Sequence, residues 1–311
     1  MRKRHLTTPL RLVAGVTALL LAMVACGGSS DSAGGDASGG GGEEKNLNIG
    51  VVEGWTDYTS TAALLSVILK NQGWDVKTTQ ISDNAPLYAG MAKGDIDLMS
   101  SSWMERTQKS YWDKYGKDLA DLGYYYDGAS LFLAVPDYSN VKSMADLPQN
   151  AAEFGNRIVG IEPGAGLTKL TQDNAIPQYG LGNDYKLVLS STAAMLTELK
   201  KATDAKQQIV VTLWKPFWAN QAFPVRALED PKKAYGDPEN LHEVANKEYA
   251  ASHPELANML ANFKLDDEQY GTLEDTVVNK FPKGQEEEAA RAWLKDNPGY
   301  EEQLVSYLKK P

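Results

Sequence analysis

The sequence is short of the residues on which most enzyme active sites depend. Its 311 residues include one cysteine, Cys26, and three histidines, at positions 5, 242 and 253. A single cysteine excludes a disulfide bond within the chain. We find no serine-nucleophile motif, no phosphate-type glycine loop and no histidine–carboxylate spacing of a metal site. A carboxylate-pair hydrolase stays open, but no pattern picks out a pair. The sequence therefore predicts a protein that is not an enzyme and holds neither metal nor cofactor.

The sequence also lacks an excess of basic residues. Lysine and arginine number 31 against 41 acidic residues, which gives a net charge of −10. Nucleic-acid binding needs clustered positive charge, so we expect no nucleic-acid partner. With 42% hydrophobic and 23% charged residues, the composition is that of a globular protein. The length suffices for one large or two medium domains.

The N-terminus has the pattern of a lipoprotein signal peptide over residues 1–25. A basic start precedes the apolar run Leu10 to Val24, and a small alanine then precedes Cys26. The last four of these residues resemble a bacterial lipobox, although Met23 stands where leucine is usual. An uncleaved membrane anchor or an incidental cysteine is the alternative. Residues 26–45 are rich in glycine and serine and predict a flexible tether. We therefore expect a lipid anchor at Cys26 and a location at the extracytoplasmic face of the cell membrane.

Strand-like and helix-like segments alternate from Leu47 onward, which predicts an α/β fold with a mainly parallel sheet. Leu47 to Val52 is the first expected strand, and Thr59 to Lys70 is the first expected helix. From residue 225 the pattern becomes rich in helices. We expect three amphipathic helices there, at 248–263, 266–280 and 285–296.

Three tryptophans, Trp55, Trp103 and Trp214, each come just past an expected strand. Ligands of open α/β sheets bind at the carboxyl ends of the strands. Indole faces are the best cation–π partners in proteins, and aromatic cages bind quaternary ammonium groups. The alternative is that all three rings lie in the hydrophobic core. Asp57 could accept a hydrogen bond from a ligand hydroxyl, lie near a cation, or cap the following helix.

The turn Gly164-Ala165-Gly166 precedes a helix-like segment and is a second candidate ligand-binding element. Backbone N–H groups at a helix N-terminus form a ready anion site. Taken by themselves, the same residues are more typical of an ordinary turn between a strand and a helix.

Several motifs occur in the order found in the substrate-binding proteins of glycine betaine/choline ABC importers, and this resemblance covers about residues 47–305. The residues that carry it are Gly54-Trp55-Thr56-Asp57, Ser102-Trp103-Met104, Asp127-Gly128-Ala129, Gly160 to Gly166, Trp214 to Trp218, and the ending Glu286 to Leu294.

The resemblance implies a two-lobed, periplasmic-binding-protein-like (type II) fold with a hinge and a central cleft. Lobe one would comprise residues 46–135 together with 225–311, and lobe two residues 136–224. Trp55, Trp103 and Trp214 would form the walls of a cage for a quaternary ammonium group. The partners would be this small ligand and an ABC permease in the membrane, and the protein would act as a monomer.

Two departures from the family bear on the ligand. In choline-binding relatives an acid at the position of Asp57 meets the ligand hydroxyl. A cage tyrosine of those relatives falls at Leu131 here, so that wall is lost or supplied by Phe132 or another residue. Betaine-binding relatives often have a cage tryptophan followed by histidine in the tail. The comparable stretch, Phe263 to Leu265, has neither.

We therefore expect the substrate-binding component of an ABC importer for glycine betaine or a related quaternary ammonium compound. Our hypothesis is that the Gly164–Gly166 amides hold the betaine carboxylate, while Asp57 orders Thr56 or the helix after it. The alternatives are a choline- or carnitine-binding protein of the same fold, or an amino-acid- or sugar-binding lipoprotein. Amino-acid binders generally clamp the carboxylate with arginine. The one arginine among the late motifs, Arg226, lies outside the strand-end loops.

Overall fold

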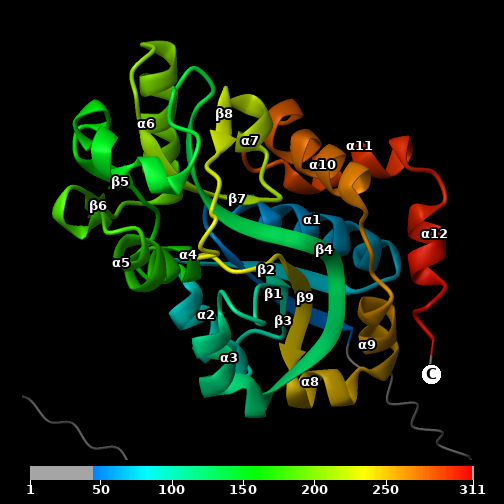
Figure 1. The fold of residues 1–311 in the computed structure, drawn as a ribbon. Helices are drawn as coiled ribbons and strands as arrows, with labels where there is room; N and C mark the ends of the chain where they lie inside the picture. The colour runs from blue at the N-terminus through cyan, green and yellow to red at the C-terminus, as the bar shows by residue number, and fades with distance from the viewer. Residues whose placement is uncertain (1–44, 310–311) are drawn as a thin grey trace, which may run out of the picture. The chain divides into compact units, whose positions relative to one another are not determined.

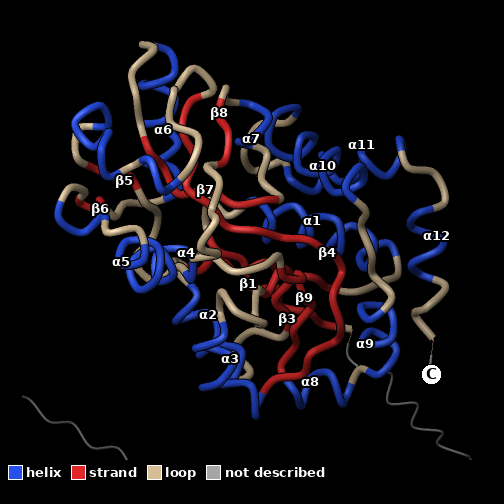
Figure 2. Tube along the Cα trace, in the orientation of Figure 1, coloured by secondary structure: helices blue, strands red, loops and turns tan. Residues whose placement is uncertain are grey.

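The computed structural model describes residues 45–309, and a sheet of nine strands runs through them (Figures 1 and 2). The strands are β1 (Asn46–Val52), β2 (Asp75–Ile81), β3 (Leu98–Ser102), β4 (Leu119–Pro136), β5 (Arg157–Val159), β6 (Lys186–Val188), β7 (Val210–Lys215), β8 (Val225–Ala227) and β9 (Glu239–Asn246). Their order is β2-β1-β3-β9-β4-β7-β5-β6, and β8 pairs with β4.

Strand β4 joins two halves of the sheet. It is 18 residues long and pairs with β9 through its first part and with β7 and β8 through its last part. In Figure 1 it is the long curved strand that crosses the middle of the view. We call β1, β2, β3 and β9, with the helices within residues 56–115 and 267–296, the first half, and β5, β6 and β7, with the helices within residues 166–222, the second half.

The sheet is mixed, so the prediction of a mainly parallel sheet is wrong. The β1–β2, β1–β3, β5–β6 and β5–β7 pairs are parallel. The β3–β9, β4–β7, β4–β8 and β4–β9 pairs are antiparallel. The antiparallel pairs all involve β4 or β9. These two strands run against their neighbours and place both halves in one continuous sheet.

Twelve α-helices cover the sheet in the described range. They are α1 (Thr56–Asn71), α2 (Asn84–Lys93), α3 (Lys109–Tyr115), α4 (Gly166–Leu170), α5 (Ile176–Gln178), α6 (Thr192–Asp204), α7 (Ala219–Ala222), α8 (Lys247–Ser252), α9 (Pro254–Ala261), α10 (Asp267–Asp275), α11 (Glu286–Asp296) and α12 (Tyr300–Val305). A π-helical stretch, Thr171–Ala175, connects α4 to α5. No helix among residues 45–309 is long and apolar enough to cross a membrane.

Helix α1 is buried over most of its length because it has apolar residues on every side. Its core residues include Leu64, Leu65 and Ile68, each with no exposed surface. Helix α11 packs against it, and Ala63, Val67 and Ala290 form a small apolar cluster between the two. The C-terminal tail therefore covers the first helix of the chain.

Strand β9 was missed in the sequence because it has the polar pattern Glu-Asn-Leu-His-Glu-Val-Ala-Asn. Seven of its eight residues are nevertheless buried. Its polar side chains have partners inside the fold: Glu239 accepts from Thr107, and Glu243 accepts from Ser100. His242 lies between Asp121 and a second carboxylate, that of Glu105.

Candidate ligand-binding site

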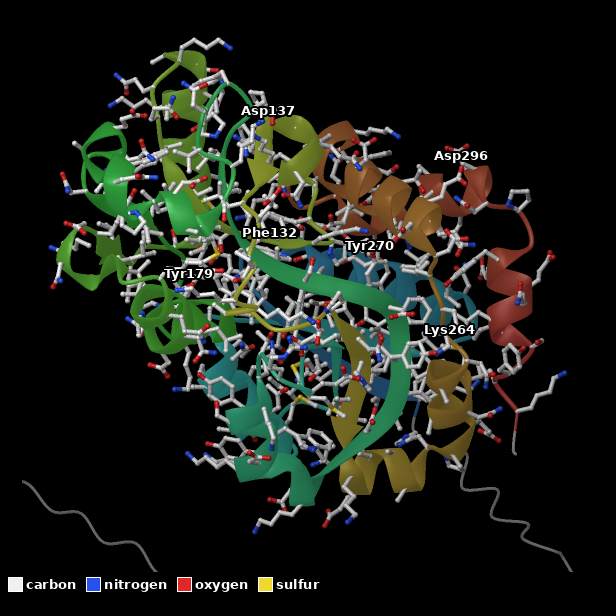
Figure 3. All side chains as sticks on the ribbon, in the orientation of Figure 1. Phe132, Asp137, Tyr179, Lys264, Tyr270 and Asp296 are labelled. Atoms are coloured by element: carbon white, nitrogen blue, oxygen red, sulfur yellow. The ribbon has the colours of Figure 1, made fainter. Side chains whose placement is uncertain are left out.

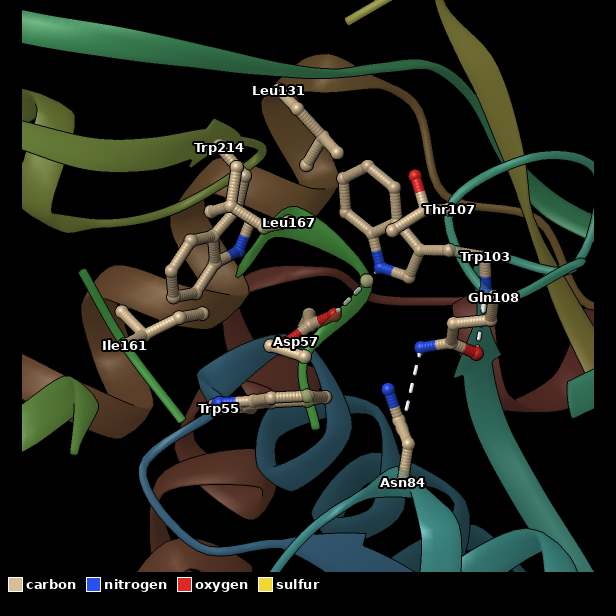
Figure 4. A pocket seen from close by; sticks show the side chains of 12 residues that line it. Trp55, Asp57, Asn84, Trp103, Thr107, Gln108, Leu131, Ile161, Leu167 and Trp214 are labelled. Atoms are coloured by element: carbon tan, nitrogen blue, oxygen red, sulfur yellow. Dashed lines mark hydrogen bonds between the residues drawn. The ribbon is translucent and has the colours of Figure 1, made fainter. Parts of the chain in front are cut away.

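A small cavity lies between the two halves of the sheet (Figure 4), with about 340 Å³ of unfilled space when the solvent at its mouth is included. The residues that line it are Trp55, Asp57, Asn84, Trp103, Thr107, Gln108, Leu131, Ile161, Ala165, Gly166, Leu167 and Trp214. The loops after β1 and β3 contribute from the first half, and the loop after β5 and strand β7 contribute from the second. A ligand in this cavity would therefore touch both halves.

The structure brings the three tryptophans singled out from the sequence to this one cavity. Trp55 comes directly before helix α1, and Trp103 directly follows strand β3. Trp214 lies inside strand β7 rather than past its end, so the expected strand end was wrong by two residues. Their exposed fractions are 6%, 4% and 4%. The Trp214 ring stacks on the Phe217 ring with centroids 3.9 Å apart, which restricts the orientation of the indole.

Asp57 lies in the first turn of α1 and points into the cavity (Figure 4). Its Oδ2 atom accepts hydrogen bonds from Ser101 Oγ at 2.7 Å and from Trp103 Nε1 at 3.2 Å. Its Oδ1 atom is buried and has no partner among the described residues. Burial disfavours the charged carboxylate and raises the pKa of Asp57 to about 6.

Asp57 does not cap α1, but the backbone N–H groups of Asp57 and Tyr58 in the first turn of the helix favour its charged form. The N-cap residue of α1 is Trp55, which makes no side-chain cap, so Asp57 does not occupy the cap position. The hydroxyl of Thr56 donates to Glu274 instead of to Asp57. The Asp57 Oδ2 atom thus accepts from two side-chain donors, whereas Oδ1 accepts from no side chain among the described residues.

Asn84 is a lining residue that the sequence reading missed. It is the first residue of α2 and has no exposed surface. Its Oδ1 atom lies 3.3 Å from Tyr58 Oη and 3.4 Å from Gln108 Nε2, both of which donate to it. Its Nδ2 atom has no partner among the described residues. Buried polar groups normally have partners. The unpaired donor of Asn84 and the unpaired acceptor of Asp57 therefore make this cavity a candidate site for a polar ligand.

Gln108 holds the loop that carries Trp103. Its Oε1 atom accepts from the Trp103 backbone N–H at 3.2 Å and from Tyr88 Oη at 2.9 Å. Its own N–H donates to the Trp103 carbonyl at 2.7 Å. Tyr88 Oη also contacts Ser102 Oγ at 2.8 Å. These buried bonds fix the backbone at Trp103, and its indole N–H is held separately by Asp57.

The glycine turn reaches the cavity only in part. The Gly164 N–H donates to Asp83 Oδ2 at 2.9 Å, and Gly164 does not line the cavity. The Ala165 N–H donates to the carbonyl of Glu162 at 3.1 Å. Ala165 and Gly166 do line the cavity, and α4 begins at Gly166. The first N–H groups of a helix have no partner within it, so the amide available at this turn lies at Gly166 rather than at Gly164.

Leu131 lines the cavity at the position of the missing cage tyrosine. Its neighbour Phe132 does not line this cavity but a separate groove, together with Tyr270. Both residues are labelled in Figure 3. Alternate residues of a strand face opposite sides. Phe132 therefore does not supply the missing wall, and that side of the cavity is aliphatic.

Comparison with known proteins gives three consistent results. The family model of the substrate-binding domain of ABC-type glycine betaine transport systems matches residues 45–296. The glycine betaine/carnitine transport binding protein GbuC of Listeria monocytogenes is 41% identical over 145 residues, which span 45% of this chain and 46% of that relative. The structure of lactococcal OpuAC in its closed form with glycine betaine has a TM-score of 0.77 and 31% identity, over 85% of this chain and 99% of that one.

An ABC-transporter choline-binding protein in complex with choline is also similar. Its TM-score is 0.75 at 26% identity, over 85% of this chain and 92% of that one. Solved relatives of this fold therefore include a glycine betaine complex and a choline complex.

Proposed function

Because this chain belongs to the family of substrate-binding domains of ABC-type glycine betaine transport systems, we propose that it binds glycine betaine or a related quaternary ammonium compound. The family is one of transporter proteins and not of enzymes. The chain has the α/β fold of the two-lobed binding proteins. It captures its ligand on the extracytoplasmic side and delivers it to an ABC permease.

The observation that carries this proposal is the meeting of three buried indoles at one cavity. Trp55, Trp103 and Trp214 come from three separate elements, and a carboxylate, Asp57, lies among them. A trimethylammonium group offers no hydrogen-bond donor, so it is bound by ring faces and by negative charge. Each ring contributes about 0.5–2 kcal/mol. Together with apolar contact, three rings suffice for micromolar affinity, about −8 kcal/mol.

The polar end of the ligand meets a different part of the cavity. The carboxylate of glycine betaine fits the Asn84 Nδ2 donor and the amide of Gly166 at the start of α4. We place the Gly164–Ala165–Gly166 turn in the site on this basis, with Gly166 as its ligand-facing member. In this arrangement Asp57 lies away from the ligand carboxylate, and its Oδ2 atom holds Trp103.

Choline is the second candidate, and one observation favours it. The Oδ1 atom of Asp57 is a buried acceptor without a partner. A hydroxyl group would donate to it, whereas a carboxylate placed beside it would be repelled when Asp57 is ionised. Carnitine, with both groups, is a further variant of the same class. An amino-acid or sugar ligand is less suited to three indole faces.

The two lobes of this proposal are residues 46–135 with 225–311, and residues 136–224. The chain passes between them at β4 and again before β8. A ligand that touches both lobes stabilises their closed arrangement by its differential affinity for it. The closed form then docks on the permease as a monomer.

The lipid anchor that we propose at Cys26 lies outside the residues that the structure describes. Residues 1–25 act as the signal peptide, Cys26 carries the lipid, and residues 26–45 tether the binding domain to the membrane surface. The support is the sequence pattern alone: an apolar run before the cysteine and a polar, glycine-rich segment after it.

Titration of the purified protein tests the proposal. Glycine betaine, choline and carnitine are added while tryptophan fluorescence is followed, with glutamine and glucose as controls. We expect saturable binding of at least one quaternary ammonium compound at micromolar concentration. Binding of glutamine or glucose in preference to all three would overturn the proposal.

A further inference from the structure

A hydrogen bond joins Trp55 of the first half to Glu162 of the second, and only Trp55 lines the cavity. The indole Nε1 donates to Glu162 Oε2 at 3.0 Å, and both side chains are buried. Glu162 follows strand β5, whereas Trp55 follows strand β1. One of the three rings at the cavity is therefore oriented by a carboxylate from the opposite half.

Glu162 is itself fixed by the start of helix α6. The backbone N–H of Thr192 donates to its Oε1 atom at 2.8 Å, and the Thr192 hydroxyl donates to Oε2 at 2.9 Å. Thr192 is the first residue of α6, and Ser191 caps the helix through its side chain. The positive end of the helix dipole favours a negative charge at this place. The carboxylate is thus held by the second half and presents one oxygen to the indole.

The backbone of Gly164, two residues after Glu162, is also hydrogen-bonded to the first half. The Gly164 N–H donates to Asp83, and the Gly164 carbonyl accepts from Tyr111 Oη at 2.8 Å. The N–H and the carbonyl of Gly164 are therefore both bound by residues of the first half. The segment 162–164 joins the two halves through three hydrogen bonds, and the bond to Trp55 is the one that reaches a cavity wall.

The two tryptophans of the first half share an arrangement. Trp103 donates its indole N–H to Asp57 at 3.2 Å, and Trp55 donates its own to Glu162 at 3.0 Å. A carboxylate at the indole N–H makes a charge-assisted bond that restricts the ring. It also puts negative charge beside a ring whose face attracts cations.

We propose that Glu162 is a positioning residue for cation binding, which orients the Trp55 ring from the opposite half and adds negative charge beside its N–H edge. The inference rests on the proposed function, because it requires a cation between the rings. When the halves separate, Trp55 loses this hydrogen-bond partner. The Trp55 ring is therefore held in its ligand-facing orientation only in the closed form. Glu162 thereby links closure to affinity for the positive charge.

Calorimetry on two Glu162 variants separates charge from position. Glu162→Gln keeps an acceptor and removes the charge, and Glu162→Ala removes both. The matched control is Glu153→Gln, an exposed acid of the same half. The probes are glycine betaine and 3,3-dimethylbutanoate, in which carbon replaces the charged nitrogen. If wild type prefers choline, the pair is choline and 3,3-dimethylbutan-1-ol.

We expect Glu162→Gln to lower the affinity for the charged probe about tenfold, the effect of roughly one lost cation interaction. Its affinity for the neutral probe should stay within about twofold of the wild-type value. Glu162→Ala should lower the affinity for both probes, and Glu153→Gln should change neither affinity. Equal loss of both probes in Glu162→Gln, or wild-type affinity in both Glu162 variants, would overturn the inference while the proposed function stands. If wild type binds no quaternary ammonium probe, the proposed function fails and the inference fails with it. Melting temperatures identify any variant that is misfolded.

Discussion

Gly166 lies against the main chain of Thr107, and the two residues belong to opposite halves of the sheet. A Cβ atom on Gly166 would come 2.1 Å from the Thr107 carbonyl oxygen. At Gly164 a Cβ atom would come 2.2 Å from the Asp83 carboxylate. Gly166 begins a helix, whose backbone any residue can adopt. Glycine is therefore required there by the close approach of the two halves.

We predict that Gly166→Ala prevents the halves from closing on the ligand. Affinity for the quaternary ammonium ligand should fall at least about tenfold, or 1.4 kcal/mol, because backbone atoms at Thr107 cannot move aside as a flexible side chain would. Gly271→Ala is the control, since a Cβ atom there meets nothing within 4 Å. It should keep its affinity and gain up to about 1 kcal/mol of stability from helix propensity. Wild-type affinity of Gly166→Ala in calorimetry would show that the contact does not limit closure.

Asp57→Asn discriminates between the two candidate ligands. Burial raises the pKa of Asp57 to about 6, so the carboxylate is mostly ionised at pH 7.5 and mostly protonated at pH 5. If the ligand is glycine betaine, the variant should bind it as well as wild type or slightly better. If it is choline, loss of the charge-assisted bond should cost about 1.5–3 kcal/mol. Calorimetry at both pH values measures this. Tight choline binding by wild type, lost in the variant and weakened at pH 5, would contradict the betaine assignment.

The tryptophans and Asp57 could be predicted from the sequence because they lie near the ends of recognisable strands and occur in motifs of fixed order. Asn84 could not be predicted. A single asparagine after an aspartate at a helix start reads as part of a cap, and Asp83 does cap α2. Its role as an unpaired donor depends on Tyr58 and Gln108, which bind its other end. Only the folded chain brings these three residues together.

The same reason explains the errors in the fold. The α/β alternation is visible because β1 and α1 are apolar, but β9 owes its burial to polar partners that lie far away in the chain. The pair Ser100 and Glu243, 143 residues apart, is an example. Without β9 the antiparallel pairing in the first half cannot be inferred. The glycine turn was recognised, but whether its amides were free depended on Asp83, which binds Gly164.

Glu243 should make the protein less stable as the pH rises. Burial raises its pKa to about 8, whereas an unfolded glutamate titrates near about 4.3. Between these values the folded state binds more protons than the unfolded state, so the free energy of unfolding falls with increasing pH. This stabilisation is complete below about pH 4 and lost as the pH passes 8. Glu274, with a pKa also raised by burial to about 8, acts in the same direction.

Glu243→Gln tests this dependence away from the ligand. Glutamine resembles the protonated acid, so melting temperatures of variant and wild type should agree at pH 5. At pH 8.5 the variant should melt several degrees higher, as expected for roughly 1 kcal/mol or more. Glu248→Gln, on the exposed start of α8, is the control and should follow wild type. Parallel melting curves for Glu243→Gln and wild type across this range would refute the assignment.

Lipid attachment is tested at Cys26. We predict that Cys26→Ser releases the protein from the membrane fraction or leaves it unprocessed, because serine cannot take the lipid. Cells are labelled with a radioactive fatty acid, and the protein is followed by its size and label. A wild-type band of mature size without label would exclude the anchor.

The central claim, that Trp103 and Trp214 bind the cation rather than only fill the core, is tested most directly by measuring affinity and melting temperature on the same alanine variants. Trp112→Ala, a half-buried tryptophan of α3 away from the cavity, serves as control. We predict that Trp214→Ala and Trp103→Ala each lose about 1–3 kcal/mol of glycine betaine or choline affinity and keep most of their stability. A loss of about 3–5 kcal/mol in stability, with normal affinity in the protein that remains folded, would contradict the account.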